Sequence, residues 1–267
     1  MEPNRRFPIR FARLSYLLLL VALSIPGLAS AQINFPKSNY YVAIGDSLSA
    51  GEGAMPVTQG AVYRLYDQSV FAKKQDMDFS NIAIRAARTW EVLNYQVPEA
   101  ICLTGFEPSV VTITVGANDF FTGDIDLYAI ASRSADIVNR LLNGASYADP
   151  QTGLARVCPG LPNVTVLIAN NYGLPIPDDP ALTAYLDFVA MTYDQLLRGI
   201  LLTVPVPAGS RVGVADLYTA FKGRNGLLLI QKKNGTGPGI FDYEVHPTNA
   251  GHAAIADEFG RAWASLP

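Results

Sequence analysis

The sequence predicts a three-layer α/β/α sandwich built on a five-stranded, mostly parallel β-sheet. Short apolar runs have the length of strands, and segments with helical periodicity separate them. Near-continuous apolar strands are typical of a parallel sheet whose two faces are both covered by helices. No internal repeat, low-complexity tract or long linker interrupts the pattern. We therefore expect one domain over residues 32–267.

Five segments have the composition of strands. Four are rich in β-branched or aromatic residues, and the fifth, at 79–84, is weaker because polar residues interrupt it. Gly45 follows the first strand and Gly116 follows the third. The predicted strands cover residues 39–43, 79–84, 109–115, 164–168 and 211–215.

Three segments show the periodicity of amphipathic helices. Apolar residues recur three or four positions apart between Ile130 and Leu141, before Gly144, and again over residues 182–200. Near the end of the chain, Ile255 and its apolar neighbours four and eight positions later share one helical face. These helices are expected to cover the sheet.

Residues 1–31 resemble a secretory signal peptide. Four arginines in the first 13 residues precede an apolar run at 16–25, and Ala29-Ser30-Ala31 has the composition of a cleavage site. The run is shorter than the roughly 20 residues that a membrane-spanning helix needs. We expect a secreted or periplasmic protein without a stable membrane anchor.

Composition excludes several classes of function. Charged residues make up 16% of the chain and the formal net charge is -3, so the sequence lacks the basic surface that nucleic-acid binding requires. Two cysteines and two histidines are too few for a zinc ribbon, and no metal or other cofactor is expected. In an oxidising compartment, Cys102 and Cys158 are expected to form a disulfide. A monomer is favoured.

Polar residues follow the first and third predicted strands, at the edge where parallel sheets bind ligands. Ser47, in Gly45-Asp46-Ser47-Leu48-Ser49, could expose its hydroxyl while its N–H faces an incoming oxyanion. Asn118, in Gly116-Ala117-Asn118-Asp119, could donate from its amide. His246 is a candidate general base in a chain with only two histidines. Each residue alone could instead be a turn, a helix cap or a structural histidine.

Together, these motifs resemble those of secreted GDSL or SGNH hydrolases, over nearly the whole of residues 32–267. The matching blocks, in order, are Gly-Asp-Ser-Leu-Ser at 45–49, Asn81 to Thr89, Gly-Ala-Asn-Asp at 116–119 and His246-Pro247. The resemblance implies a flavodoxin-like SGNH hydrolase fold and a serine esterase or lipase. Ser47 would be the nucleophile and His246 the base of an acyl-enzyme mechanism. The oxyanion hole would comprise the N–H groups of Ser47 and Ala86 and the side chain of Asn118.

Two positions depart from the family pattern. Ala86 stands where glycine is usual, and it would be strained if the position requires a positive φ. Tyr243 stands where the family has the aspartate that orients the histidine. Asp242 is the first candidate to replace that aspartate, and Glu244 or the main-chain carbonyl of Tyr243 are the alternatives.

Charged residues near these blocks allow two interpretations. Arg85 and Arg88 could bind an anionic substrate group, or they could form surface ion pairs. Glu52 could line the cleft, or favour the start of a helix. His252 is expected to pack on the final helix.

The expected substrates are small-molecule, lipid or glycan esters, including short acyl esters, lysophospholipids and acetylated sugars. An acyltransferase of the same fold, or a catalytically impaired binding protein, are the alternatives. An α/β-hydrolase of the Gly-x-Ser-x-Gly type is disfavoured because that motif is absent.

Overall fold

The structure is a computed structural model, and it describes residues 39–103, 109–148, 153, 155–232 and 243–267. The described residues from Asn39 onward belong to one compact unit. The expected signal peptide at residues 1–31 lies outside the described residues.

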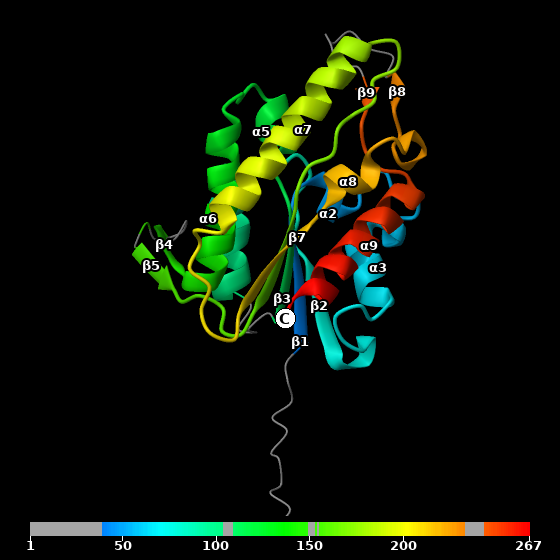
Figure 1. Cartoon of the computed structure of the whole chain (residues 1–267). Helices are drawn as coiled ribbons and strands as arrows, with labels where there is room; N and C mark the ends of the chain where they lie inside the picture. The colour runs from blue at the N-terminus through cyan, green and yellow to red at the C-terminus, as the bar shows by residue number, and fades with distance from the viewer. Residues whose placement is uncertain (1–38, 104–108, 149–152, 154, 233–242) are drawn as a thin grey trace, which may run out of the picture. The chain divides into compact units, whose positions relative to one another are not determined.

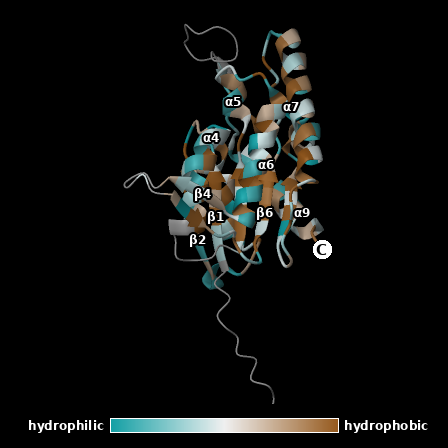
Figure 2. Ribbon diagram, turned by 90° about the vertical axis from the view of Figure 1, so that its left-hand side faces the viewer, coloured by the Kyte–Doolittle hydropathy of each residue, from teal (hydrophilic) through white to brown (hydrophobic). Residues whose placement is uncertain are grey.

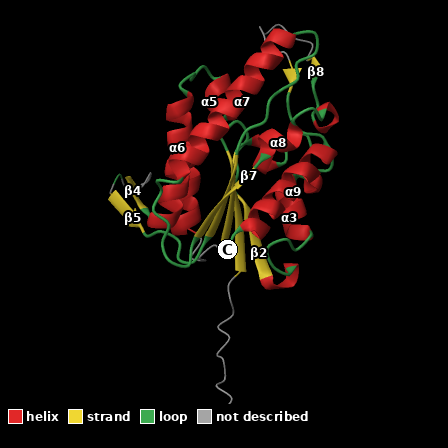
Figure 3. Cartoon of the chain, viewed as in Figure 1, coloured by secondary structure: helices red, strands yellow, loops and turns green. Residues whose placement is uncertain are grey.

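The centre of the fold is a five-stranded sheet in the order β2-β1-β3-β6-β7, and all its strand pairs are parallel (Figure 3). The chain enters at β1, adds β2 on one side and then returns to add β3 on the other. In such sheets, ligands bind outside the carboxyl ends of the strands at the point where the strand order reverses. The strands are β1 (Asn39–Gly45), β2 (Met77–Asn81), β3 (Val110–Thr114), β6 (Thr165–Ala169) and β7 (Arg211–Ala215).

Helices cover both faces of the sheet (Figure 1). The first layer comprises α6 and α7 with the π-helical turns η3 and η4, and the second comprises α3, α8 and α9. Alternate residues of each strand face opposite layers, so Val42 packs with the first layer and Tyr41 with the second. The bounds are α3 (Ala61–Asp67), η3 (Val92–Gln96), η4 (Glu99–Leu103), α6 (Leu127–Asn143), α7 (Pro180–Leu201), α8 (Leu217–Phe221) and α9 (Asn249–Ser265).

Short elements complete the described chain. Two antiparallel pairs, β4-β5 and β8-β9, lie outside the main sheet. The remaining elements are α2 (Ser47–Ala50), η1 (Val57–Gln59), η2 (Lys74–Asp76), α4 (Thr89–Glu91), α5 (Ala117–Phe121), β4 (Ala145–Ala148), β5 (Ala155–Cys158), η5 (Asn225–Leu227), β8 (Gln231–Lys232) and β9 (Tyr243–Glu244). Apolar residues concentrate where the helices meet the sheet (Figure 2).

The predicted fold class is confirmed, and one strand differs in its bounds. β2 spans Met77–Asn81 instead of residues 79–84. It ends at Asn81, whose side chain accepts a hydrogen bond from the N–H of Ala83 (3.2 Å) in a turn-like arrangement. Ile82 and Ile84 still donate to carbonyls of β1, so this segment follows the sheet beyond the regular strand.

Two further expectations concern the membrane and the cysteines. None of the helices within the described residues is both long and apolar enough to span a bilayer. Cys158 is buried and its Sγ lies 2.6 Å from the hydroxyl of Tyr147. The side chain of Cys102 lies outside the described residues, so the Cys102–Cys158 disulfide stays a prediction.

Candidate active site

Ser47 begins the short helix α2, directly beyond the carboxyl end of β1. Gly45 closes the strand with φ +124°, and a Cβ at this position would lie 2.0 Å from the carbonyl oxygen of Thr114 on β3. Only glycine permits that close approach. Asp46 then caps the helix by accepting from the N–H of Leu48 (3.0 Å). The chain therefore turns sharply at Gly45 and presents Ser47 at the edge of the sheet.

A buried glutamine fixes the same turn from the first helical layer. The side chain of Gln96, in η3, accepts from the N–H of Gly45 (2.6 Å) and donates to its carbonyl (2.9 Å). This pair of bonds satisfies both main-chain polar groups of Gly45. Gln96 was not predicted as a site residue. Its signal was a polar residue at helical spacing from the apolar Val92 and Leu93.

His246 lies beside Ser47, with Nε2 3.0 Å from the serine Oγ. It lies in the loop between β9 and α9. The N–H of Leu229 donates to the His246 carbonyl (2.7 Å). On the other side of the loop, a Cβ at Gly53 would lie 2.3 Å from the carbonyl oxygen of Pro247. Glycine at position 53 thus allows the loop after α2 to pack directly against the histidine loop.

The other ring nitrogen of His246, Nδ1, contacts Oε1 of Glu244. The same oxygen accepts from the main-chain N–H of His246 (3.3 Å). Asp242, the first candidate for this role, lies outside the described residues. The structure thus places a carboxylate on His246 from the position two residues before it.

Ala86 lies exposed in the loop after β2, and Asn118 lies on α5, among the residues that line the cavity at Ser47. Ala86 has φ 61°, in the left-handed region that favours glycine, and this conformation costs an alanine about 1 kcal/mol. The position does have a positive φ, so the alanine is strained there, as expected for this case. Asn118 donates from Nδ2 to the carbonyl of Ala87 (3.0 Å), which ties the side chain to the same loop.

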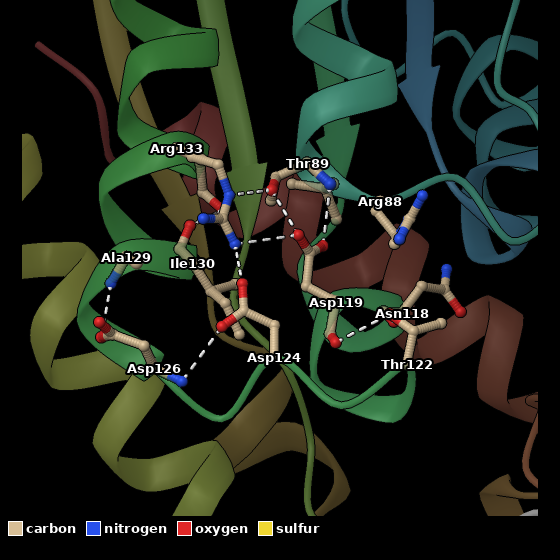
Figure 4. A network of polar contacts seen from close by, with 12 residues as sticks. Arg88, Thr89, Asn118, Asp119, Thr122, Asp124, Asp126, Ala129, Ile130 and Arg133 are labelled. Carbon is tan, nitrogen blue, oxygen red and sulfur yellow. Dashed lines mark hydrogen bonds and ion pairs between the residues drawn. The ribbon is translucent and has the colours of Figure 1, made fainter.

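A charged network joins the helix that carries Asn118 to two neighbouring helices (Figure 4). The buried carboxylate of Asp119 accepts from the N–H (2.8 Å) and the hydroxyl (2.5 Å) of Thr89. Arg133, on α6, donates to the Thr89 hydroxyl (2.7 Å) and to Asp119 (3.2 Å), and it also contacts Asp124. The network connects α5, α6 and α4 (Thr89–Glu91), the helix that follows the loop carrying Ala86.

Asp46 is a buried acid directly before the serine. Burial raises the pKa of this carboxyl from 3.8 to about 7, although hydrogen bonds from Thr114 and Leu48 oppose the shift. The Thr114 hydroxyl lies 2.7 Å from Oδ1 of Asp46. Asp46 therefore titrates close to neutral pH.

The three charged residues that could bind substrate all make ion pairs. Arg85 lies 2.9 Å from Glu52, and Arg88 lies 3.1 Å from Glu91. Arg88 also lies over the ring of Trp90. For Arg85 and Arg88, these contacts agree with the alternative of surface ion pairing. The expectation that Glu52 stands at the start of a helix is wrong, because Glu52 follows the end of α2.

His252 is fully buried on α9. Its Nδ1 accepts from the N–H of Ala61 (3.2 Å), and its Nε2 donates to the carbonyl of Glu52 (2.8 Å). Burial lowers the pKa of the imidazole. A neutral His252 thus links α9 to α3 and to the loop after α2.

A cavity opens at Ser47. Within the described residues, no group of three or more His, Cys, Asp or Glu side chains is arranged to hold a metal ion. The lining residues are Asp46, Ser47, Leu48, Ala117, Asn118, Phe121, Asn171, Tyr172, Leu174, Val245 and His246.

The parallel five-stranded sheet and the polar residues at its carboxyl edge define an α/β protein of the SGNH hydrolase fold. The chain belongs to the GDSL-like lipase/acylhydrolase family, whose sequence model matches residues 41–259. A comparison with curated proteins found no significant match.

Several solved structures share this fold. A lipolytic protein of the G-D-S-L family from Veillonella parvula is 18% identical with a TM-score of 0.55, over 86% of this chain and 100% of that one. A carbohydrate esterase of family 3 from Talaromyces cellulolyticus is 15% identical with a TM-score of 0.56, over 85% and 96%. An acetylxylan esterase from Geobacillus stearothermophilus is 16% identical with a TM-score of 0.53, over 84% and 93%.

Proposed function

We propose that the protein is a secreted serine esterase that hydrolyses carboxylic esters through an acyl-enzyme on Ser47. The observation that carries this proposal is the 3.0 Å separation between Oγ of Ser47 and Nε2 of His246. A serine hydroxyl is a weak nucleophile until an adjacent base removes its proton, and this distance suits that transfer. Secretion rests on the signal-peptide pattern of residues 1–31.

In the proposed reaction, the serine oxygen attacks the ester carbonyl carbon while Nε2 of His246 takes the hydroxyl proton. The carbonyl oxygen becomes an oxyanion, which accepts hydrogen bonds from the N–H groups of Ser47 and Ala86 and from Nδ2 of Asn118. His246 then gives its proton to the departing alcohol, and an acyl-serine remains. Water releases the acid by the same steps, with His246 again acting as base.

Glu244 supports His246 as a positioning residue. Its carboxylate contacts Nδ1, which holds the proton on that nitrogen and leaves Nε2 free to accept one from Ser47. When the imidazole becomes protonated, the negative charge of Glu244 stabilises it. In this proposal Ser47 is the nucleophile, His246 is the base and Glu244 is the acid that orients the base.

The direct test compares two serines of the same motif. The wild type, Ser47→Ala and Ser49→Ala are assayed on p-nitrophenyl acetate and butyrate with EDTA present. Ser49 is a matched control because its hydroxyl lies 2.8 Å from that of Thr114, on the sheet side of α2. Ser47→Ala is expected to lower kcat by about 10⁴-fold or more, and Ser49→Ala by less than about tenfold.

Labelling with a fluorophosphonate gives a second readout that does not depend on the choice of ester. We expect stoichiometric labelling of the wild type and of Ser49→Ala, and none of Ser47→Ala. A wild type that is neither labelled nor active would refute the esterase. Transfer of the acyl group to an added alcohol in preference to water would instead identify an acyltransferase.

A further inference from the structure

We infer that Gln96 is a positioning residue of the proposed esterase and sets the place of the Ser47 main-chain N–H in the oxyanion hole. This inference rests on the proposed function, because it concerns the same serine. Gln96 is the last residue of the π-helical turn η3 and is buried, with an exposed fraction of 1%. Its side chain binds Gly45, which lies two residues before the nucleophile.

The turn that carries the nucleophile leaves one main-chain N–H free. From Gly45 to Ala50, Ser47 is the only residue whose N–H has no acceptor among the residues that the structure describes. A donor that is held in place and free suits an oxyanion hole, because it need not rearrange when the oxyanion forms. The acceptors of the other N–H groups are Gln96 for Gly45, Thr114 for Asp46 and Ser49, and Asp46 for Leu48 and Ala50.

Two elements hold this turn, β3 from within the sheet and η3 from the first helical layer. On β3, the Thr114 carbonyl accepts from the N–H of Asp46 (3.0 Å). From η3, Gln96 binds both the N–H (2.6 Å) and the carbonyl (2.9 Å) of Gly45. Two bonds to one residue fix its orientation as well as its distance. Gly45 needs this restraint because a glycine has wide backbone freedom, and a rotation there would move the N–H of Ser47.

Packing alone does not explain a glutamine at position 96. The residues around it on the same helical segment are apolar and buried, and they include Val92, Leu93 and Val97. An aliphatic side chain would avoid the desolvation cost of the amide. π-helical turns are also rare and occur frequently at functional sites. Because Gln96 satisfies two polar groups of Gly45, its loss is expected to reduce stability too, and the test must separate stability from rate.

The first test removes both bonds and compares the result with a matched loss elsewhere. Gln96→Met keeps a side chain of similar length without the amide. It is expected to lower kcat for p-nitrophenyl butyrate about 10²-fold with KM within about threefold, because a catalytic group misplaced by about 1 Å can cost that much. Thr112→Val removes a buried hydrogen bond to the hydroxyl of Tyr41 (2.8 Å), in the same strand pair, and is expected to change kcat less than about threefold. Urea unfolding measures the stability of both variants.

The second test uses a carboxyl that can imitate the amide. In Gln96→Glu, the protonated carboxyl can donate to the Gly45 carbonyl and accept from its N–H, whereas the ionised form cannot donate. Burial favours the protonated form, so the measurement extends from about pH 5.5 to about pH 9.5. We expect kcat within about threefold of the wild type at the low end, and a ratio of variant to wild type that falls at least about tenfold at the high end. Asp46, Glu244 and His246 are common to both proteins, so the ratio reports mainly the introduced carboxyl.

The outcomes distinguish the role of Gln96 from the proposed function. Equal losses of kcat in Gln96→Met and Thr112→Val would overturn the role of Gln96. A constant kcat ratio for Gln96→Glu across this pH range, in protein shown to be folded by circular dichroism, would also overturn it. If Gln96→Met does not fold, the ratio for Gln96→Glu decides alone. A wild type with no turnover above the Ser47→Ala background and no fluorophosphonate labelling would instead overturn the proposed function, and the role of Gln96 with it.

Discussion

Oε1 of Glu244 contacts Nδ1 of His246 from only two residues earlier in the chain. The strand β9 ends at Glu244, and the loop turns at Val245 so that both side chains reach the same edge of the sheet. The carboxylate also accepts from the main-chain N–H of Val245 (3.2 Å). This local turn lets a glutamate reach the imidazole without the residue spacing that the family pattern suggests.

We predict that Glu244→Gln lowers kcat by about 10³- to 10⁴-fold, because an amide cannot stabilise the protonated imidazole. Asp242→Asn is the comparison, with an expected loss below about tenfold. Steady-state kinetics on p-nitrophenyl butyrate measure both. The opposite order of losses would assign the orienting role to Asp242.

Substitution of one histidine is predicted to affect mainly stability, and substitution of the other mainly activity. His252→Ala removes two buried hydrogen bonds and should lower the free energy of unfolding by about 3 kcal/mol while kcat stays within about threefold. His246→Ala should lower kcat by about 10⁴-fold with little effect on stability. Urea unfolding and ester hydrolysis, measured on both variants, check the pair. A large loss of kcat in folded His252→Ala would show that it serves the reaction.

Asp46 predicts a distinct pH dependence of stability. Burial raises its pKa from 3.8 to about 7, so between these values the folded state binds a proton that the unfolded state has released. Its contribution to stability is fully present below pH 3.8 and is lost as the pH rises through about 7. At 1.36 kcal/mol per pKa unit, the loss approaches about 4 kcal/mol.

Asp46→Asn keeps an acceptor for Leu48 and Thr114 but cannot ionise. The stability of this variant relative to the wild type should therefore increase from pH 4.5 to pH 8. Urea unfolding across this range measures the difference. A constant difference would mean that the folded and unfolded pKa values of Asp46 are the same.

Ala86→Gly is predicted to stabilise the protein slightly. Relief of the left-handed conformation contributes about 1 kcal/mol, and the greater freedom of glycine in the unfolded chain offsets part of it. We expect a gain near 0.5 kcal/mol, or a rise in Tm of about 1–2 °C. Ala83→Gly, outside the positive-φ region, should destabilise by about 0.5–1 kcal/mol. Calorimetry on both variants checks the sign of each effect.

The Asp119 network is predicted to support both stability and the oxyanion site. Asp119→Ala leaves the buried N–H of Thr89 without its partner and should cost about 3 kcal/mol. It should also lower kcat more than it raises KM, because α5, which carries Asn118, loses its bonds to α4 and α6. Asp136→Ala removes a partly exposed ion pair with Arg140 and should cost less than about 1 kcal/mol. Equal effects of the two variants would contradict this role.

The sheet and its long helices could be predicted from the sequence because burial on both faces leaves strong apolar patterns. β6 spans Thr165–Ala169, one residue from the predicted 164–168. The predicted bounds of β2 were less accurate. This strand lies at the edge of the sheet with one partner, where polar residues are tolerated and weaken the apolar pattern. The β4-β5 pair was not predicted, because both strands are short and largely exposed and so lack an apolar pattern.

Site residues could be predicted where the residue type itself supplies the reactive group. Residues whose role depends on their position in the folded chain were harder to predict. Ser47, Asn118 and His246 come from motifs, and the structure brings all three to one cavity. The contact of Glu244 with His246 depends on the turn after β9, which no periodicity reports. The role of Gly53 depends on a contact with Pro247, far along the chain.

The contact between Ser47 and His246 joins residues 199 positions apart. Closing so long a loop is entropically costly, and long-range contacts of this kind form late when a chain folds. We expect the two side chains to meet only after the strands have assembled and α9 has packed on the sheet. If the proposed esterase activity is present, its recovery after dilution from denaturant is expected to lag behind the recovery of the helical circular dichroism signal.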